Sequence, residues 1–361
     1  VMVMADVGKP RKTYVLMRGN YASPVKEKPL EPGTPGVLPA QTKESPSNRL
    51  GLARWLFQPD HPLTSRVAVN RYWYMLFGRG IVKTIEEFGS QGDWPSNLQL
   101  LDWLAVDFRE NGWNVKRMLK QMLMSSTYRQ SARASSGLVK LDPENKFLGR
   151  GPRFRLQAEF IRDTILSASG LLVTDIGGRG VKPYQPPGLW NEVSLGGNVR
   201  FVQDHGEKLY RRGMYTYWKR SSPAPSLTIF DTPTREKCVL RRSRTNTPLQ
   251  ALVLLNDPQY IEAARSLAQK ITLEAGDSID ARIVLAYRLA TAHSPSTKTL
   301  TLLKKAYEEE LAVFQKDPER AKKLLGVGES KRDTTIDAAE HAALTIICSM
   351  ILNLDATVTK G

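Results

Sequence analysis

Residues 247–272, TPLQALVLLNDPQYIEAARSLAQKIT, carry the signals for two consecutive helices. Thr247 is a good N-cap, Pro248 suits the first helical position and Gln250 completes a capping box, which together predict a helix over 248–256. From Pro258 onward the apolar residues recur at intervals of three and four. This spacing predicts helices at 258–272, 278–291, 295–315 and 335–353. The C-terminal part of the chain, 247–361, is therefore predicted to be helical.

Helical spacing also dominates residues 47–172. Thr64 is the expected cap of one of these helices, and Ser96 with Gln99 forms a capping box for the next. Asn111-Gly112 then separates two helices that are expected to form an αα-hairpin. The predicted helical segments are 50–57, 64–77, 98–110, 114–123 and 157–172.

Two stretches interrupt the helical pattern. In the leader, 1–46, six prolines fall within residues 22–46 and favour an extended chain, preceded by a strand candidate at Thr13–Arg18. Residues 173–246 are rich in glycine and proline and are predicted to form loops, with Met214–Trp218 as the best strand. The predicted fold class is mainly α: a multi-helix domain with an extended Pro-rich N-terminal leader and a loop-rich insertion carrying short strands. Residues 47–172 and 247–361 are expected to pack as one unit.

The composition is that of a basic globular protein. The 361 residues carry a net charge of +16, with a sequence pI near 9.8, which favours anionic partners such as acidic glycans, nucleic acid or acidic lipid. A basic surface kept for solubility is an equally good explanation, because the charges are spread along the chain. No run of 18 or more apolar residues offers a membrane span. The first residues, Val1 to Asp6, lack the features of a signal peptide, and the sequence resembles a fragment of a longer protein.

Cysteine and histidine usage argues against several cofactors. Cys238 and Cys348 form no Cys-x-x-Cys-His motif, so no haem attachment is expected, and whether these two cysteines pair is left open. The four histidines lie far apart, which predicts no metal site. No Gly-x-Ser-x-Gly elbow and no P-loop is present, although hydrolytic chemistry is not excluded.

Two pairs of polar residues stand four positions apart on predicted helices. Arg66 and Asn70 form either a ligand-facing edge or a buried hydrogen-bond network, and the network is the favoured interpretation. Glu159 and Asp163 could act as a general acid and base, but nearby arginines favour structural ion pairs.

The insertion is the most site-like region, since loops on a rigid scaffold often carry binding residues. Its aromatic side chains could stack on sugar rings and its arginines could bind sulfate or carboxylate, with Trp190, Arg211, Arg212 and Trp218 as named candidates. The alternative is that the aromatic residues only fasten the loop to the helices.

Three arginines directly precede the helix that begins after Thr247. A helix N-terminus presents free amides and the positive end of a dipole, so Arg241, Arg242, Arg244 and Thr247 are the best single candidate for an anion site. Alternatively, the cap satisfies the amides and the arginines pair with carboxylates such as Glu159 or Asp163.

Many short blocks follow one another along the chain, among them Asn48-Arg49-Leu50, Phe77-Gly78-Arg79-Gly80, Pro183-Tyr184-Gln185-Pro186-Pro187-Gly188-Leu189-Trp190 and Leu255-Asn256-Asp257. In this order the blocks resemble the planctomycete family called domain of unknown function 1553, and the similarity extends from about Arg11 to Leu354. His61 departs from the family pattern, in which asparagine usually precedes Pro62. The resemblance implies an exported protein, periplasmic or on the cell surface, whose domain follows further modules, often a c-type cytochrome carrying haem. It also implies genomes rich in sulfatases and glycan-degrading enzymes, and it supplies no catalytic residues.

These observations favour one function and leave two alternatives. The preferred hypothesis is an extracytoplasmic module that recognises or processes an anionic glycan beside a c-type cytochrome partner, and whether it is an enzyme is left open. The first alternative is a structural or docking domain for cytochrome-bearing neighbours. The second is nucleic-acid binding, which only the positive charge supports.

Overall fold

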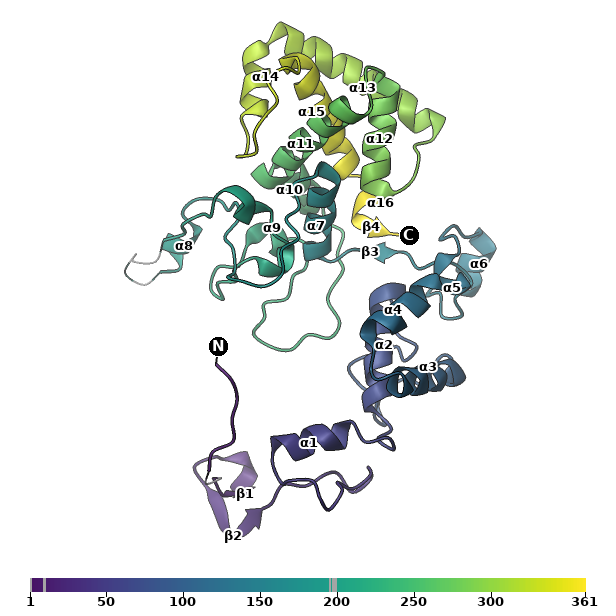
Figure 1. Cartoon of the computed structure of the whole chain (residues 1–361), viewed down its shortest axis with the longest axis vertical. Coiled ribbons are helices and arrows are strands. Elements are labelled where there is room, and N and C mark those ends of the chain that lie inside the picture. Colours follow the sequence, from purple (N-terminus) through teal and green to yellow (C-terminus); the bar gives the residue numbers. More distant parts are fainter. Residues whose placement is uncertain (1, 9–10, 195, 197–199) are drawn as a thin grey trace. The chain divides into compact units, whose positions relative to one another are not determined.

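The computed structural model describes residues 2–8, 11–194, 196 and 200–361 (Figure 1). The chain divides into two compact units, Val1–Pro152 and Arg153–Gly361. The mainly α fold class is confirmed, because helices predominate and the strands are few and short. No helix among the described residues is long and apolar enough to cross a membrane.

The first unit begins with a β-hairpin in the leader. Strand β1 (Thr13–Leu16) pairs antiparallel with β2 (Pro24–Leu30), and the 3₁₀ turn η1 (Met17–Gly19) connects them. The expected strand at Thr13–Arg18 thus stops at Leu16. The prolines in β2 are tolerated because a two-stranded sheet consists only of edge strands.

The helices of the first unit surround a small aromatic core. Helix α2 packs on α3, and Trp73 stacks on Phe77 with ring centroids 3.9 Å apart. Further core side chains come from α3 and α4, including Leu101, Phe108 and Met118. The helices are α1 (Arg49–Leu56), α2 (Thr64–Phe77), α3 (Leu98–Glu110), α4 (Val115–Met124), α5 (Ser126–Arg129) and α6 (Ser136–Leu141).

Two of the expected caps are wrong in detail. At the start of α2, the Nδ1 atom of His61 accepts the backbone amides of Leu63 and Thr64, each at 3.3 Å, so the histidine ring replaces Thr64 as the cap. At the start of α3, Asn97 accepts the amide of Leu100, whereas the hydroxyl of Ser96 donates to the carbonyl of Ile81. In both cases a neighbouring side chain, His61 or Asn97, accepts the hydrogen bonds of the free amides at the helix start.

Arg66 and Asn70 take different partners. Asn70 is fully buried and exchanges two hydrogen bonds with the backbone of Val82, at 2.9 and 3.0 Å. Arg66 donates to Asp102 at 2.7 Å and to the carbonyl of Pro62 at 2.5 Å. Both residues therefore fix packing within the first unit.

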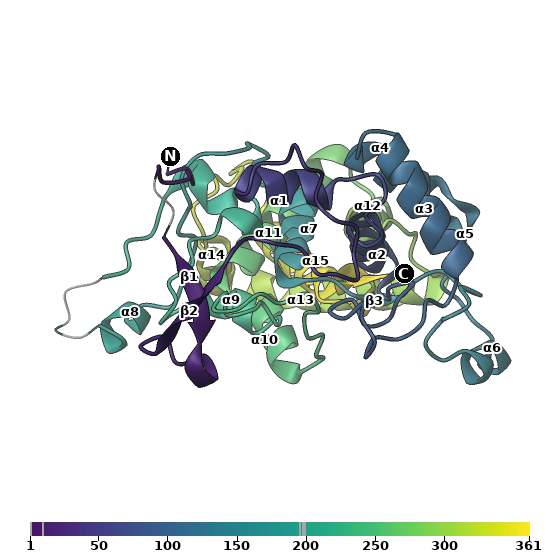
Figure 2. The same cartoon turned by 90° about the horizontal axis from the view of Figure 1, so that it is seen from below.

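The second unit is built around helix α11 (Pro258–Glu274). This helix packs against α15 (Ala338–Leu352) and α7 (Ala158–Ser169), and these three helices lie together in both views (Figures 1 and 2). Small side chains such as Ala263, Ala264 and Ala268 are fully buried and permit the close approach. The other helices are α8 (Leu189–Glu192), α9 (Pro225–Thr228), α10 (Pro248–Asn256), α12 (Ile279–Thr291), α13 (Thr297–Lys316), α14 (Pro318–Leu325) and α16 (Asp355–Val358).

Residues 153–172 belong to this second unit, not to the N-terminal helical part in which the sequence placed them. The buried face of α7 contacts α11, and strand β3 (Phe154–Arg155) pairs with β4 (Thr359–Lys360) at the C-terminus. The unit boundary at Pro152 therefore precedes the expected boundary at residue 172.

The insertion contains less strand than expected. Met214–Trp218 does not form a strand, because Gly213–Tyr215 adopts a 3₁₀ turn, η3, after the 3₁₀ helix η2 (Gly206–Tyr210). Only isolated parallel bridges, Val173 with Arg211 and Val181 with Thr216, remain within the described residues. Cys238, in the same insertion, is exposed, whereas Cys348 is buried in α15, and the two thiols are unpaired.

The first prediction concerns the core helix. Replacing Leu267 of α11, which is fully buried, by alanine should lower the free energy of unfolding by about 2–5 kcal/mol, because a cavity remains. Leu273→Ala on the same helix is the matched control, since that side chain is 61% exposed. Chemical denaturation measures both variants, and equal losses would contradict the assigned core.

Candidate functional site

Two of the three arginines before α10 contact groups of the fold. Arg242 donates to the carboxylate of Glu159 on α7 at 2.6 Å, and the guanidinium of Arg244 lies 4.4 Å from the ring centroid of Phe154. Arg241 is exposed. The pair of Arg242 with Glu159 is the structural arrangement considered as the alternative to an anion site.

Helix α10 begins at Pro248 as predicted, but the predicted capping box of Thr247 and Gln250 does not form. Thr247 occupies the N-cap position without a side-chain hydrogen bond. The amide of Gln250 donates instead to the carbonyl of Ile229 and the hydroxyl of Thr245, at 3.0 and 3.1 Å. The glutamine therefore holds the insertion against α10.

Arg211 shapes a loop of the insertion. Its guanidinium donates to the carbonyls of Asp175, Gly177 and Arg179 and lies 3.9 Å from the ring centroid of Tyr215. The Gly-rich turn therefore wraps around this cation, and three of its donors are occupied by carbonyl oxygens.

Arg212 lies close to Asp163 of α7. The Asp163 carboxylate accepts the amide of Gly213 at 2.6 Å, and burial raises the pKa of this carboxyl group. Glu159 and Asp163 thus have different partners, Arg242 and the Gly213 amide, and the nearby charge of Glu159 also contributes to the raised pKa of Asp163.

The two tryptophan candidates occupy different environments. The indole of Trp218 donates to the carbonyl of Thr234 at 3.0 Å, with the guanidinium of Arg235 4.6 Å from its ring centroid. Trp190, on α8, is 6% exposed, which leaves no free face for stacking on a sugar. Its Nε1 atom has no hydrogen-bond partner in the part of the chain that the structure describes.

Two lysines gather around Trp190. The ammonium groups of Lys182 and Lys219 lie 5.2 and 4.8 Å from the Trp190 ring centroid, and Lys182 is also 5.4 Å from the centroid of Tyr217. Tyr217 is 48% exposed, so this lysine–aromatic cluster opens to solvent. Neither lysine forms an ion pair with a carboxylate among the described residues.

A pocket is lined in part by residues 184–187, which lie in the sequence between Lys182 and Trp190. Its volume is about 560 Å³, a size typical of ligand sites. Apolar side chains of four prolines and of α10 form most of its wall, and the polar side chains at its edge include Gln185, Asn256 and Asp257. We call it the proline pocket; its apolar residues are Pro186, Pro187, Pro225, Ile229, Leu249, Leu252, Val253 and Pro258.

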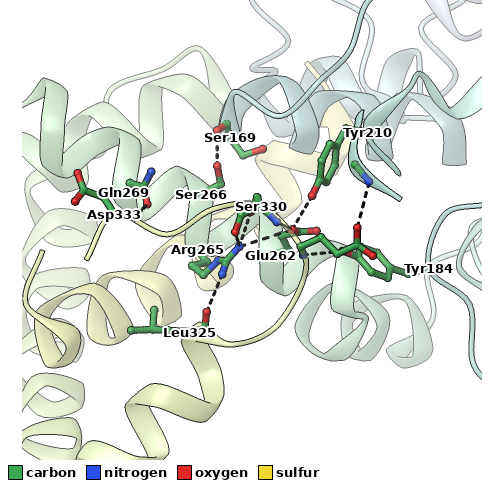
Figure 3. Close-up of polar contacts among 12 residues, drawn as sticks. Ser169, Tyr184, Tyr210, Glu262, Arg265, Ser266, Gln269, Leu325, Ser330 and Asp333 are labelled. Carbon is green, nitrogen blue, oxygen red and sulfur yellow. Dashed lines mark hydrogen bonds and ion pairs between the residues drawn. The ribbon is translucent and has the colours of Figure 1, made fainter. Parts of the chain in front are cut away.

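Hydrogen bonds to Glu329 hold part of the wall of the proline pocket. The hydroxyl of Tyr184 accepts the amide of Glu329 at 3.0 Å, and the amide of Gln203 donates to the Glu329 carboxylate at 3.2 Å. Burial next to Glu262 raises the pKa of Tyr184 and of Tyr210. Figure 3 shows both tyrosines pointing toward Glu262, whose carboxylate accepts the Tyr210 hydroxyl at 2.8 Å. These contacts hold Tyr184 and Gln203, two residues that line the pocket, against Glu329.

Sequence reasoning named Trp190 but missed Lys182 and the proline pocket. A signal for the pocket exists in the block Pro183–Trp190, where a tyrosine and two prolines adjoin a glutamine. No such signal identifies Lys182, because its proximity to Lys219 arises from the path of the loop. No group of three or more His, Cys, Asp or Glu side chains that could hold a metal ion occurs among the described residues.

Comparison with known proteins identifies one match. The family model described as a protein of unknown function, DUF1553, matches residues 48–307, which is most of the chain and shorter than the similarity expected from the sequence blocks. No curated protein and no solved structure matches the chain significantly.

The second prediction separates structural from ligand-binding arginines. Arg242→Ala should lower the free energy of unfolding by about 1–3 kcal/mol, because it leaves the largely buried Glu159 carboxylate without its partner. Arg220→Ala is the control, since its pair with Glu236 is solvent-exposed and such pairs contribute little. Thermal melts of both variants test this, and an unchanged melting temperature for Arg242→Ala would assign Arg242 to another role.

Proposed function

Because the chain belongs to the DUF1553 family, whose description states no activity, we propose its function from the geometry of the site: it is a module that binds an anionic saccharide through the lysine–aromatic cluster. The main observation behind this proposal is that the ammonium groups of Lys182 and Lys219 both lie over the ring of Trp190. Neither lysine has a carboxylate partner among the described residues. Two such ammonium groups attract a carboxylate or sulfate group. The half-exposed ring of Tyr217 offers an apolar surface for a sugar ring beside them.

Charge supports an anionic ligand over a neutral one. The net charge of +16 creates a positive potential that raises the local concentration of polyanions and speeds their association. The lysine side chains can adapt to ligands of different shape, because the ammonium group is a compact charge on a flexible stem.

The proposal places the module outside the cytoplasm, next to a c-type cytochrome partner, as the family resemblance implies. It concerns recognition, since the carboxylates of Glu159 and Asp163 are engaged by Arg242 and by the Gly213 amide. A purely docking role beside cytochrome-bearing neighbours is the alternative that the next experiment distinguishes.

The third prediction tests the cluster directly. The double variant Lys182→Gln, Lys219→Gln should bind a sulfated or uronate-rich oligosaccharide roughly five- to thirtyfold more weakly, if each exposed charge contact contributes about 0.5–1 kcal/mol. Its melting temperature should stay unchanged. Isothermal titration calorimetry on the full chain measures the affinity.

A matched control removes the same charge elsewhere. Lys298→Gln with Lys316→Gln neutralises two exposed lysines on α13 and should leave the affinity within about twofold of the parent. If both double variants bound the oligosaccharide equally weakly, the attraction would come from the net charge of the chain and not from the cluster. No detectable binding by the parent chain would favour the docking role instead.

The fourth prediction concerns salt. Binding of the same oligosaccharide should weaken steadily with added NaCl, because the Debye length falls from about 8 Å at physiological ionic strength to about 3 Å at 1 M. Retention on a heparin column that persists unchanged into molar salt would contradict an electrostatic site.

A further inference from the structure

We propose that the proline pocket receives the acetamido group of an N-acetylated sugar unit within the anionic saccharide. This inference rests on the proposed function, and it names the class of saccharide that the chain selects.

The apolar wall of the pocket fits a neutral group. Leu249 and Leu252 of α10 are 59% and 53% exposed, although they lie beside Pro186 and Pro187 in a hollow. Apolar side chains held open in this way are stabilised when a methyl-bearing group displaces water from them. The methyl group of an acetamido substituent is such a group.

The polar edge supplies hydrogen-bonding groups of both kinds. Gln185 lines the pocket, and its Nε2 atom is a buried donor without a partner among the described residues, so rotation of this side chain into the pocket would let it donate to a ligand carbonyl. Asn256 donates through Nδ2 to the carbonyl of Leu252, which leaves its Oδ1 atom to accept an N–H group. An amide carries one acceptor and one donor, so an acetamido group can satisfy both.

Charge excludes an anionic group from the same position. Asp257 lines the pocket and uses Oδ1 to accept the amide of Gln259 at 2.9 Å. Burial raises the pKa of this carboxyl group, and a sulfate or carboxylate group placed beside it would be repelled by its ionised form or would require it to take up a proton from solvent. The pocket therefore takes the neutral substituent, whereas the two lysines take the anionic one.

The two subsites are close enough for one ligand. Lys182 precedes Tyr184 by two residues and Trp190 follows Pro187 by three, and a chain spans at most about 3.6 Å per residue. Lys182 and Trp190 therefore lie on either side of the pocket residues Tyr184–Pro187 in the sequence. The distances along the chain are short enough for an oligosaccharide of a few units to reach both the cluster and the pocket.

The test compares two probes that differ at one substituent. Heparosan hexasaccharide, with alternating glucuronate and N-acetylglucosamine, is compared with the hexasaccharide in which sulfate replaces each N-acetyl group. Charge attraction alone predicts tighter binding of the N-sulfated probe, because it carries more negative charge. The pocket predicts the opposite, with the N-acetylated probe bound at least about fivefold more tightly in calorimetry on the full chain.

Substitutions in the pocket test whether the preference for the N-acetylated probe arises there. The double variant Gln185→Ala, Leu252→Ala should lose the preference for the N-acetylated probe while retaining binding that depends on Lys182 and Lys219. Leu273→Ala, which truncates an exposed leucine on α11, is the matched control and should keep the preference. Melting temperatures check that each variant is folded.

The outcomes separate this inference from the proposed function. Equal or tighter binding of the N-sulfated probe, or a preference that survives in the pocket variant, overturns the acetamido assignment alone. Absence of binding to either probe, or binding that does not depend on the two lysines, overturns the proposed function as well.

Discussion

The guanidinium of Arg162 is the interaction on which the second unit depends. Its side chain is almost fully buried on α7, where it donates to Gln259 of α11 at 2.7 Å and to the carbonyls of Leu209 and Arg211 at 2.7 and 2.5 Å. One cation thereby joins α7, α11 and the insertion. Burial lowers the pKa of Arg162, yet the side chain remains charged because arginine begins from a very high pKa. Without it, the side-chain oxygen of Gln259 and the carbonyl of Arg211 would lose this donor, which costs more than the hydrogen bonds themselves contribute, whereas the Leu209 carbonyl would keep the Gln259 amide as a donor.

A second buried group, Glu262, fastens the other side of the insertion. Its carboxylate accepts the amide of Ser330 at 2.5 Å and lies 3.7 Å from Arg265, whose guanidinium donates to the carbonyl of Leu325 at 2.7 Å (Figure 3). Gly328 makes this approach possible, since it has a φ of +87° and a Cβ atom there would lie 2.3 Å from the Glu262 side chain. The loop after α14 is thus held on α11, and through Glu329 it holds Tyr184 and Gln203. The loops of the proposed site are therefore tied to α11 through Glu262 and Glu329, and ordering of this kind would lower the entropy cost of binding a ligand.

The helices were largely predictable because periodicity is local information. The segment 258–272 was predicted as a helix and α11 spans Pro258–Glu274, and α10 begins at Pro248 as its proline indicates. Helix α14 was missed, although Asp317-Pro318 repeats the cap and proline signal of Asp257-Pro258 and could have revealed it. The hydrogen-bond and ion-pair partners of the side chains were much harder to predict from the sequence. Arg242 and Glu159 are 83 residues apart, and only the fold brings them together, so the sequence offered this pair as one alternative among several.

The different chemistry of arginine and lysine explains why the proposed site lies at lysines and not at the arginines that the sequence favoured. Arginine presents several donors in a planar fork, and around the insertion Arg162, Arg211 and Arg242 use them to bind carbonyls and a carboxylate of the fold. Such cations shape the loops but have few donors left for a ligand. Lysine concentrates its charge in one mobile group that a single aromatic face can support without neutralising it. In a chain with 52 basic and 36 acidic residues, the cations available to a ligand are those that the fold leaves without carboxylates, and Lys182 and Lys219 meet that condition within the described residues. The arginines therefore determine where the loops lie, and under the proposed function the lysines determine what those loops attract.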